Sequence, residues 1–300
     1  MDNRTLQLFL SLADTLHFGR TSEACHISPS ALSRTIKQLE ETLGVTLFQR
    51  DNRSVSLTRE GERFQEYARE SLLQWETFRD SLMAEAGELH GEISIYCSVT
   101  ASYSFLYDIL SEFRQAHPKI EIKLHTGDPA QGIAHVLAGQ EDISIAARPD
   151  RLPGDIAFRR IAISPLVYIA PSSGPLSEQL HPGQGAISWA EIPMILSEEG
   201  IARERLDSWF NRLGIKPRIY AQVAGHEAIV SMVSLGFGVG VVPKIVLDNS
   251  PLADRVVTLD TPSELGVYDV GICVLKKRLK SPLVSAFWGQ FEAAHKKPPP

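Results

Sequence analysis

The sequence has few of the features that mark secreted, membrane-spanning or metal-clustered proteins. Its three cysteines lie far apart and form no Cys-x-x-Cys pair, so neither a disulfide framework nor a zinc cluster is indicated. No run of about 18 apolar residues occurs, which argues against a transmembrane helix. The N-terminus has no basic stretch followed by an apolar run, so we expect no secretory signal and a cytoplasmic location.

The motifs of common enzyme classes are missing as well. Gly-x-Ser-x-Gly and Gly-Lys-Ser/Thr do not occur, and the nine histidines have no ligand spacing. His226-Glu227 has valine at position 230 where a zinc protease motif needs a second histidine. The glycines of residues 236–240 precede a predicted strand and complete no dinucleotide-binding pattern. We therefore expect no enzyme, no cofactor and no metal.

Charge is spread unevenly along the 300 residues, whose formal net charge is −6. Residues 1–60 contain seven basic and seven acidic residues, so the rest of the chain carries the whole net charge. The length suggests two or three domains, and 43% hydrophobic with 22% charged residues is ordinary for a globular protein. A neutral N-terminal segment on an acidic body is compatible with a small DNA-reading domain joined to a domain with another role.

The first 58 residues are predicted to form short helices followed by a hairpin. Apolar residues at helical spacing indicate a first helix, and a second short helix runs through residues 18–25. Ser28 and Pro29 suit the start of a third helix, which runs to about Leu43 and has Gly44 as its C-terminal cap. Residues 45–50 and 54–58 are predicted to be strands joined by a turn.

Residues 18–40 have the helix, tight turn and second helix of a helix-turn-helix. Polar side chains off the apolar stripe of the third helix suit the major groove, and the basic hairpin suits a phosphate or the minor groove. The helical face alone is explained equally well as a solvated surface, but the cap, the turn and the hairpin together favour DNA binding. The candidate DNA-binding residues are Ser28, Pro29, Ser30, Ser33, Arg34, Lys37, Gln38, Arg50 and Arg53.

A long helix without proline is predicted from Arg59 to about Ala86. At about 1.5 Å per residue it would extend roughly 40 Å, which is long for a surface helix of a monomer. Its apolar residues have roughly heptad spacing, and its other face is charged. We favour a dimerisation seam over a buried core helix, and the seam would be made by Phe64, Trp75, Phe78 and Leu82.

After residues 87–91 the hydrophobic period changes. Predicted strands and helices alternate from residue 93 to residue 147 and again from 186 to 242, which implies a mostly parallel, helix-covered sheet. We predict a two-lobed body in which the chain crosses between lobes near residues 162–166 and again near 266–269. Lobe I would then contain about 92–162 and 268–295, and lobe II about 163–267.

Residues 1–60 resemble the winged helix-turn-helix of LysR-type transcriptional regulators. The matching stretches are Phe18–Arg20, Ser28–Arg34, Ile36–Glu40, Leu43-Gly44, Leu47–Arg50 and Val55–Gly61. Glu60 departs from the alanine usual in the family, but glutamate is a good helix former near an N-terminus, so we expect no functional loss. The resemblance implies a winged helix-turn-helix domain at 1–58, a linker helix at 59–87 and a two-lobed, periplasmic-binding-protein-like (type 2) α/β effector domain at 92–295.

The chain further resembles those family members that activate branched-chain amino acid (isoleucine and valine) biosynthesis. The matching stretches are His17–Arg20, Cys97–Ala101, Glu121–Asp128, Gly225–Ala228, Val230–Val233 and Lys276–Leu279. This resemblance implies an activator that responds to acetolactate or acetohydroxybutyrate; a regulator with a different small carboxylate effector and target is the alternative. The implied partners are double-stranded DNA, the carboxylate, other copies of the chain in a homodimer or homotetramer, and RNA polymerase, with no membrane. A solute-binding protein would lack residues 1–60 as they stand.

The turn after the first body strand is a candidate anion site. Ser98, Thr100 and Ser102 surround a predicted helix start, where unpaired N–H groups and the positive end of the helix dipole favour a carboxylate. Ordinary N-capping explains these hydroxyls about as well. The position at the carboxyl end of a strand in an open α/β lobe favours the ligand, and by resemblance this turn faces the cleft of the family.

Two further positions are candidates for the effector site. Arg148 follows the third body strand and would hold a second anionic or keto oxygen, although a surface ion pair explains it slightly better. His226 and Glu227 stand at the start of an apolar helix, where they would bond a hydroxyl and a keto group or simply cap the helix. An acetohydroxy acid presents these groups, as do other small hydroxy or keto acids.

Overall fold

The computed structural model of the chain describes residues 1–50, 54–85, 89–180, 187–260 and 265–294. The chain divides into an N-terminal unit, Met1–Ala86, and a C-terminal unit, Gly87–Pro300. None of the helices in these described ranges is long and apolar enough to cross a membrane.

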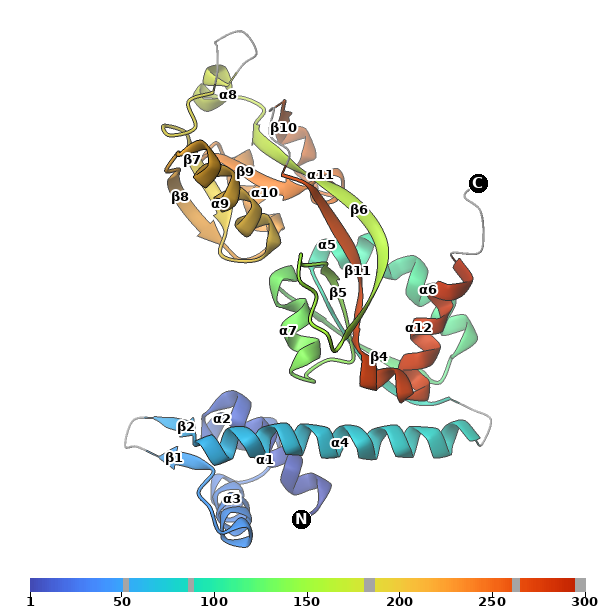
Figure 1. The fold of residues 1–300 in the computed structure, drawn as a ribbon. Helices are drawn as coiled ribbons and strands as arrows, with labels where there is room; N and C mark the ends of the chain where they lie inside the picture. The colour runs from blue at the N-terminus through green and yellow to red at the C-terminus, as the bar shows by residue number, and fades with distance from the viewer. Residues whose placement is uncertain (51–53, 86–88, 181–186, 261–264, 295–300) are drawn as a thin grey trace. The chain divides into compact units, whose positions relative to one another are not determined.

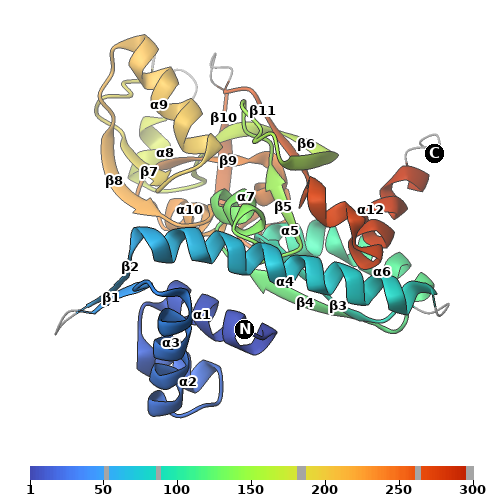
Figure 2. The same cartoon turned by 60° about the horizontal axis from the view of Figure 1, so that its bottom comes forward.

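The N-terminal unit contains three short helices, a hairpin and one long helix (Figure 2). These elements are α1 (Asn3–Thr15), α2 (Phe18–Ala24), α3 (Pro29–Leu43), β1 (Phe48–Arg50), β2 (Val55–Leu57) and α4 (Arg59–Glu85). Helix α3 has the predicted bounds because its ends are well capped: Ser28 Oγ accepts the Ala31 amide at 3.2 Å, and Gly44 takes the left-handed conformation with φ of 70°.

The core of this unit corrects one prediction about the dimerisation seam. Phe64 is only 8% exposed, and its ring packs edge-on against Phe9 with centroids 4.7 Å apart. It belongs to the cluster that also holds Leu32, Ile36 and Phe48. The heptad pattern assigned Phe64 to the seam, but this first part of α4 is covered by α1, so Phe64 fills the core of its own unit instead.

The C-terminal unit is built on a nine-stranded sheet. Eight strands follow the order β4-β3-β5-β11-β6-β9-β7-β8, and the ninth, β10, pairs with β6. Its strands are β3 (Gly91–Cys97), β4 (Ile120–Thr126), β5 (Ile143–Ala147), β6 (Ile156–Pro171), β7 (Pro193–Ser197), β8 (Arg218–Val223), β9 (Val239–Pro243), β10 (Val256–Leu259) and β11 (Val267–Leu275). Its helices are α5 (Val99–Ser104), α6 (Leu106–Ala116), α7 (Gly132–Leu137), α8 (Pro175–Gln179), α9 (Ile201–Leu213), α10 (His226–Ser234), α11 (Lys244–Asp248) and α12 (Pro282–Ala294), with 3-10 turns η1 (Pro129–Gln131), η2 (Ala253–Arg255) and η3 (Lys276–Lys280).

Two lobes share this sheet (Figure 1). Strands β4, β3 and β5 form a parallel set in lobe I, and β8, β7 and β9 form a parallel set in lobe II. Between them, β6 and β11 run antiparallel to each other and continue from one lobe into the other. The sequence predicted the parallel sets; the two crossing strands make the sheet mixed, because the chain passes between the lobes once in each direction.

The crossing strands are irregular at one point. Their register shifts between Val270 and Gly271. A Cβ at position 271 would lie 2.4 Å from the Phe158 ring and 2.5 Å from the Arg159 carbonyl oxygen, so only glycine fits. A bulge at this point bends the strand pair where the two lobes join.

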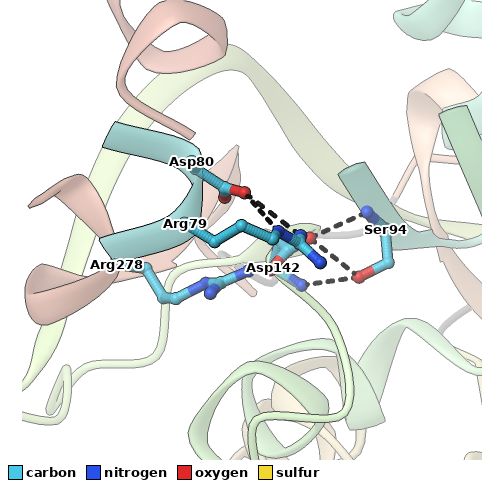
Figure 3. A network of polar contacts seen from close by, with 5 residues as sticks. All are labelled: Arg79, Asp80, Ser94, Asp142 and Arg278. Carbon is cyan, nitrogen blue, oxygen red and sulfur yellow. Dashed lines mark hydrogen bonds and ion pairs between the residues drawn. The ribbon is translucent and has the colours of Figure 1, made fainter. Parts of the chain in front are cut away.

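A polar cluster in lobe I joins β3, the start of β5 and η3 (Figure 3). The Asp142 carboxylate accepts the Ser94 amide at 2.9 Å and the Ser94 hydroxyl at 3.2 Å, and it pairs with the Arg278 guanidinium. These contacts tie β3 to the start of β5 and to η3, so the cluster braces the sheet of lobe I. Figure 3 also draws Arg79 and Asp80, an ion pair within helix α4 of the N-terminal unit.

Candidate functional site

Helix α3 divides cleanly into a buried and an exposed face. Leu32, Ile36 and Leu39 are buried in the core of the N-terminal unit. The candidate DNA-binding residues of this helix lie off that stripe, with Ser33 half-buried and the others exposed: Pro29, Ser30, Ser33, Arg34, Lys37 and Gln38. The exposed face therefore presents two cations and several hydroxyl and amide groups to solvent.

The Ser30 and Lys37 side chains already have partners in the described part of the chain. Ser28 caps the helix and lies 3.1 Å from the Ser30 hydroxyl, while Lys37 pairs with Glu41 at 3.6 Å on the exposed surface, a contact of little energetic weight. Within the described part of the chain, no side chain pairs with the Arg34 guanidinium. Arg34 is the cation of α3 whose donors are available to a nucleic acid.

The hairpin is attached to α2 and α3 through Arg50 and Glu40. Glu40 Oε1 accepts the amides of Leu47 and Phe48 at 2.8 and 3.1 Å, and its other oxygen pairs with Arg50 at 3.4 Å. The Arg50 guanidinium also lies over the Phe18 ring, 4.8 Å from its centroid. Arg50, proposed from sequence as a DNA contact, thus also supports the hairpin.

Arg53 and the tip of the hairpin lie outside the described residues. Its proposed contact with DNA therefore stays a prediction. Beyond Phe64, the other members of the proposed seam, Trp75, Phe78 and Leu82, are each about half exposed on α4. Tyr67, which belongs to the same roughly heptad-spaced apolar residues of this helix, is also about half exposed.

A cleft with an internal cavity of about 30 Å³ lies between the lobes of the C-terminal unit. Lobe I contributes α5, η1 and β5, lobe II contributes α10 and α11, and β11 forms part of the wall. The lining residues are Ser98, Thr100, Ala101, Phe105, Pro129, Ile145, Ala146, Ala147, His226, Pro243, Ile245, Val246, Tyr268 and Val270. The wall is mostly apolar with a few convergent polar groups, which is typical of a small-molecule site.

The predicted anion site is occupied by a carboxylate of the chain itself. Glu227 Oε1 accepts the Thr100 amide at 2.8 Å and the Thr100 hydroxyl at 2.6 Å. Thr100 is at the start of α5 in lobe I, and Glu227 is in the first turn of α10 in lobe II. The structure therefore brings together residues that the sequence analysis placed in one site, but they pair with each other across the cleft.

The protonation of this pair follows from its surroundings. Burial disfavours the charged form of Glu227, but hydrogen bonds from Thr100 and from the backbone outweigh it and lower the pKa of the carboxyl. Burial also lowers the pKa of His226, against the opposing charges of Glu227 and Asp128. At neutral pH the cleft therefore holds a charged Glu227 beside a neutral His226.

The remaining predicted effector residues have different places. Ser98 lines the cavity, but its hydroxyl caps α5 by accepting the Ala101 amide at 3.1 Å. Ser102 was expected in the effector site; it instead donates to the Val99 carbonyl at 2.7 Å and lines an outer groove with Tyr103 and residues of α6. Ser102 lies two residues after Thr100, about half a turn around the helix, so its side chain points away from the cleft.

Arg148 also does not line the cavity. It is exposed, and its guanidinium lies 5.6 Å from the centroid of the Phe158 ring, while its amide bonds the Asp269 carbonyl at 2.8 Å. Arg148 leaves β5 at the end of the strand and turns onto the crossing strand β6. The structure thus removes it from the group of residues that converge on the cleft.

Tyr268 is a cavity residue that the sequence analysis missed. It is 7% exposed, and its ring meets the 6% exposed His226 edge-on with centroids 5.6 Å apart. Among the described residues, neither the Tyr268 hydroxyl nor the His226 ring has a hydrogen-bond partner. Its place on a strand predicted to cross between the lobes was the available signal.

Comparisons with known proteins agree with this arrangement. Residues 3–62 match the family described as "Bacterial regulatory helix-turn-helix protein, lysR family", and residues 86–296 match "LysR substrate binding domain". The chain is 46% identical over 292 residues to the HTH-type transcriptional activator IlvY of Salmonella typhimurium, covering 96% of this chain and 98% of that one. It is 45% identical to IlvY of Haemophilus influenzae over 97% and 100% of the two chains.

Among solved structures, full-length CbnR complexed with its target DNA has the same fold. It superposes with a TM-score of 0.61 at 23% identity, covering 98% of this chain and 100% of that one. At this identity the likeness concerns the fold alone.

Proposed function

The chain belongs to the LysR family of bacterial transcriptional regulators, and from this we propose that it is an activator of branched-chain amino acid biosynthesis that senses an acetohydroxy acid. The observation that carries the proposal is the 45–46% identity to IlvY activators over nearly the whole of both chains, which spans the DNA-reading and the effector-binding parts together. We further propose that the chain acts in the cytoplasm and is not an enzyme.

DNA is read by the exposed face of α3. Arg34 can give two donors to a guanine edge, and Lys37 and Gln38 can reach a base edge or a phosphate from the next turn. Ser28, Pro29, Ser30 and Ser33 lie at the N-terminal part of the same helix, and Arg50 and Arg53 place the hairpin against the backbone. A partly palindromic site follows if two copies are joined through α4 by Trp75, Phe78 and Leu82, and two such dimers form a tetramer.

The effector binds in the cleft of the C-terminal unit. Thr100 offers an amide and a hydroxyl to a carboxylate, and the unpartnered groups of Tyr268 and His226 are available to a hydroxyl or a ketone. Acetolactate and acetohydroxybutyrate carry these three groups on a small apolar frame, which suits the mostly apolar wall. Ser98 completes the polar part of the site, and Glu227, which bonds Thr100 in the structure, lies beside it.

Regulation is then a population shift. The effector favours one closure of the two lobes, and this changes the spacing of the DNA-binding pairs presented to the operator and to RNA polymerase. A coupling of about 1.4 kcal/mol changes DNA affinity or geometry tenfold, which one charge-assisted hydrogen bond can supply. The alternative is a family member with a different small carboxylate effector and target.

A mobility-shift titration with DNA from immediately upstream of the chain's own gene tests the DNA-reading half. We expect Arg34→Ala to lose roughly 10- to 100-fold in specific affinity, since a bidentate guanine contact is worth about 1–3 kcal/mol. Arg212→Ala, which removes an exposed arginine from the C-terminal unit, is the charge-matched control and should bind normally. Unchanged operator affinity of Arg34→Ala would remove this residue from the readout.

A further inference from the structure

The Glu227 contact with Thr100 has the chemistry of a bound ligand. One carboxylate oxygen accepts both donors of Thr100, the amide and the hydroxyl, at 2.8 and 2.6 Å. An external carboxylate bound at the start of α5 would use these same two donors, and the Ser98 hydroxyl, which accepts the Ala101 amide, keeps its own O–H to donate beside them. The effector and Glu227 therefore compete for one place.

The cavity cannot neutralise two carboxylates at once. None of the described residues that line it is a lysine or an arginine, and the guanidinium of Arg148, which follows β5, lies over the Phe158 ring of β6 instead. Asp128 adds a negative charge that acts on His226 and Tyr268, and Arg205, which does not line the cavity, adds a positive charge that acts on Tyr268. Two anions a few ångströms apart in such surroundings repel each other strongly, so an effector carboxylate excludes the Glu227 carboxylate from Thr100.

The same contact also joins the lobes. Glu227 reaches from α10 in lobe II to α5 in lobe I, and the lobes touch a second time where the Gln131 amide donates to Glu199. At this second place a Cβ on Gly200 would be 2.9 Å from the Ala130 Cβ, so the lobes are in close contact. The Glu227 carboxylate thus joins the two lobes across the cleft.

We propose that Glu227 is a specificity-determining residue that acts as an internal ligand: it holds the Thr100 donors and the closed cleft until an effector carboxylate displaces it. The identity of the effector rests on the proposed function, and the displacement of Glu227 is a further step in how that effector binds. Only a ligand that carries a carboxylate can replace the acceptor that Thr100 loses when Glu227 leaves. Tyr268 and His226, which lack partners among the described residues, select for further oxygens on the same ligand. A neutral ligand of the same shape would leave Glu227 in place.

The test compares Glu227→Gln and Glu227→Ala with the wild type in the full-length protein. Glutamine keeps the size and one acceptor but removes the charge, and alanine removes the competitor altogether. Calorimetry with acetolactate should give about tenfold tighter binding for Glu227→Ala and an intermediate gain for Glu227→Gln. Glu199→Gln is the matched control, since it removes the other charge that bridges the lobes without touching Thr100, and its affinity should stay within twofold of wild type. Equal or weaker binding by Glu227→Ala would overturn the proposal, because it would make Glu227 a direct partner of the effector or a bystander.

A second measurement needs no effector. Hydrogen exchange of the Thr100 amide, followed in the effector-free protein, should be at least tenfold faster in Glu227→Ala than in the wild type and unchanged in Glu199→Gln. Unchanged exchange in Glu227→Ala overturns the internal ligand whatever the effector is. If acetolactate binds no variant while the amide result is as expected, the effector named above is wrong and the internal ligand is supported.

Discussion

Replacing Tyr268 with phenylalanine removes one oxygen atom from the wall of the cleft and nothing else. The ring is buried at 7% exposure and packs against His226, and both features are kept by phenylalanine. The hydroxyl has no hydrogen-bond partner among the described residues, and burial raises its pKa, so it stays protonated and is a donor at every pH of interest.

Two effects of Tyr268→Phe are expected, one on the stability of the free protein and one on its affinity for the effector. In the effector-free protein the change should leave the free energy of unfolding within about 0.5 kcal/mol, because the hydroxyl lines the cavity and has no hydrogen-bond partner among the described residues to lose. In the complex the effector loses a donor and keeps an unpaired oxygen, which costs about 1.5 kcal/mol, or roughly tenfold in Kd. Chemical denaturation and calorimetry with acetolactate measure the two quantities on the same preparation.

Tyr220→Phe is the matched control. Tyr220 lies in the same unit and stacks on Phe237 with centroids 5.7 Å apart, but it is exposed and outside the cleft, so neither quantity should change. A Tyr268→Phe protein that binds acetolactate as well as wild type would refute the role of this hydroxyl. A protein that unfolds more easily would show that the hydroxyl has a structural partner.

Three further predictions concern the rest of the chain. Trp75→Asp, which places a charge on the exposed apolar face of α4, should shift the protein from dimers or tetramers to monomers in sedimentation, whereas Tyr220→Asp should not; intact dimers would show that the seam lies elsewhere. Gly271→Ala should lower the free energy of unfolding by about 1–3 kcal/mol through overpacking, while Gly289→Ala, whose added methyl meets nothing within 4 Å, should not lower it; equal melts would contradict the close approach. Because the pKa of His226 is lowered in the folded state, unfolded chains take up a proton below pH 6.5 that the folded chain does not, so stability is full above that pH and falls below it; His226→Gln should flatten this part of the slope between pH 7.5 and 5.5 in urea melts.

Local signals in the sequence were sufficient to place most elements. The cap at Ser28, the proline at position 29 and the glycine at position 44 define the ends of α3 to the residue, because these signals act through contacts within a few positions of the chain. The long helix from Arg59 and the parallel strands of both lobes were predicted for the same reason. Within the predicted alternation of strands and helices, the segment between β3 and β4 contains two helices, α5 and α6, because the backbone at Phe105 leaves the helical conformation.

Contacts between distant segments could not be predicted in the same way. Phe64 has the spacing of a seam residue, and only the packing of α1 against α4 shows that it belongs to the core. Ser102 has a hydroxyl of the kind that binds anions, but the direction of its side chain depends on its position around helix α5. Thr100 and Glu227 were each assigned to the effector site, yet their mutual hydrogen bonds join positions 127 residues apart and are set by the closure of the lobes.

Footprinting of the full-length wild-type protein on its own upstream DNA, with and without acetolactate, tests the central claim most directly. We expect protection of a partly palindromic site in both conditions and a changed protection pattern when acetolactate is present, since the effector alters the spacing of the DNA-binding pairs. A pattern that stays the same with acetolactate, with acetohydroxybutyrate and with other small hydroxy and keto acids would contradict the claim that this regulator senses a small carboxylate in its cleft.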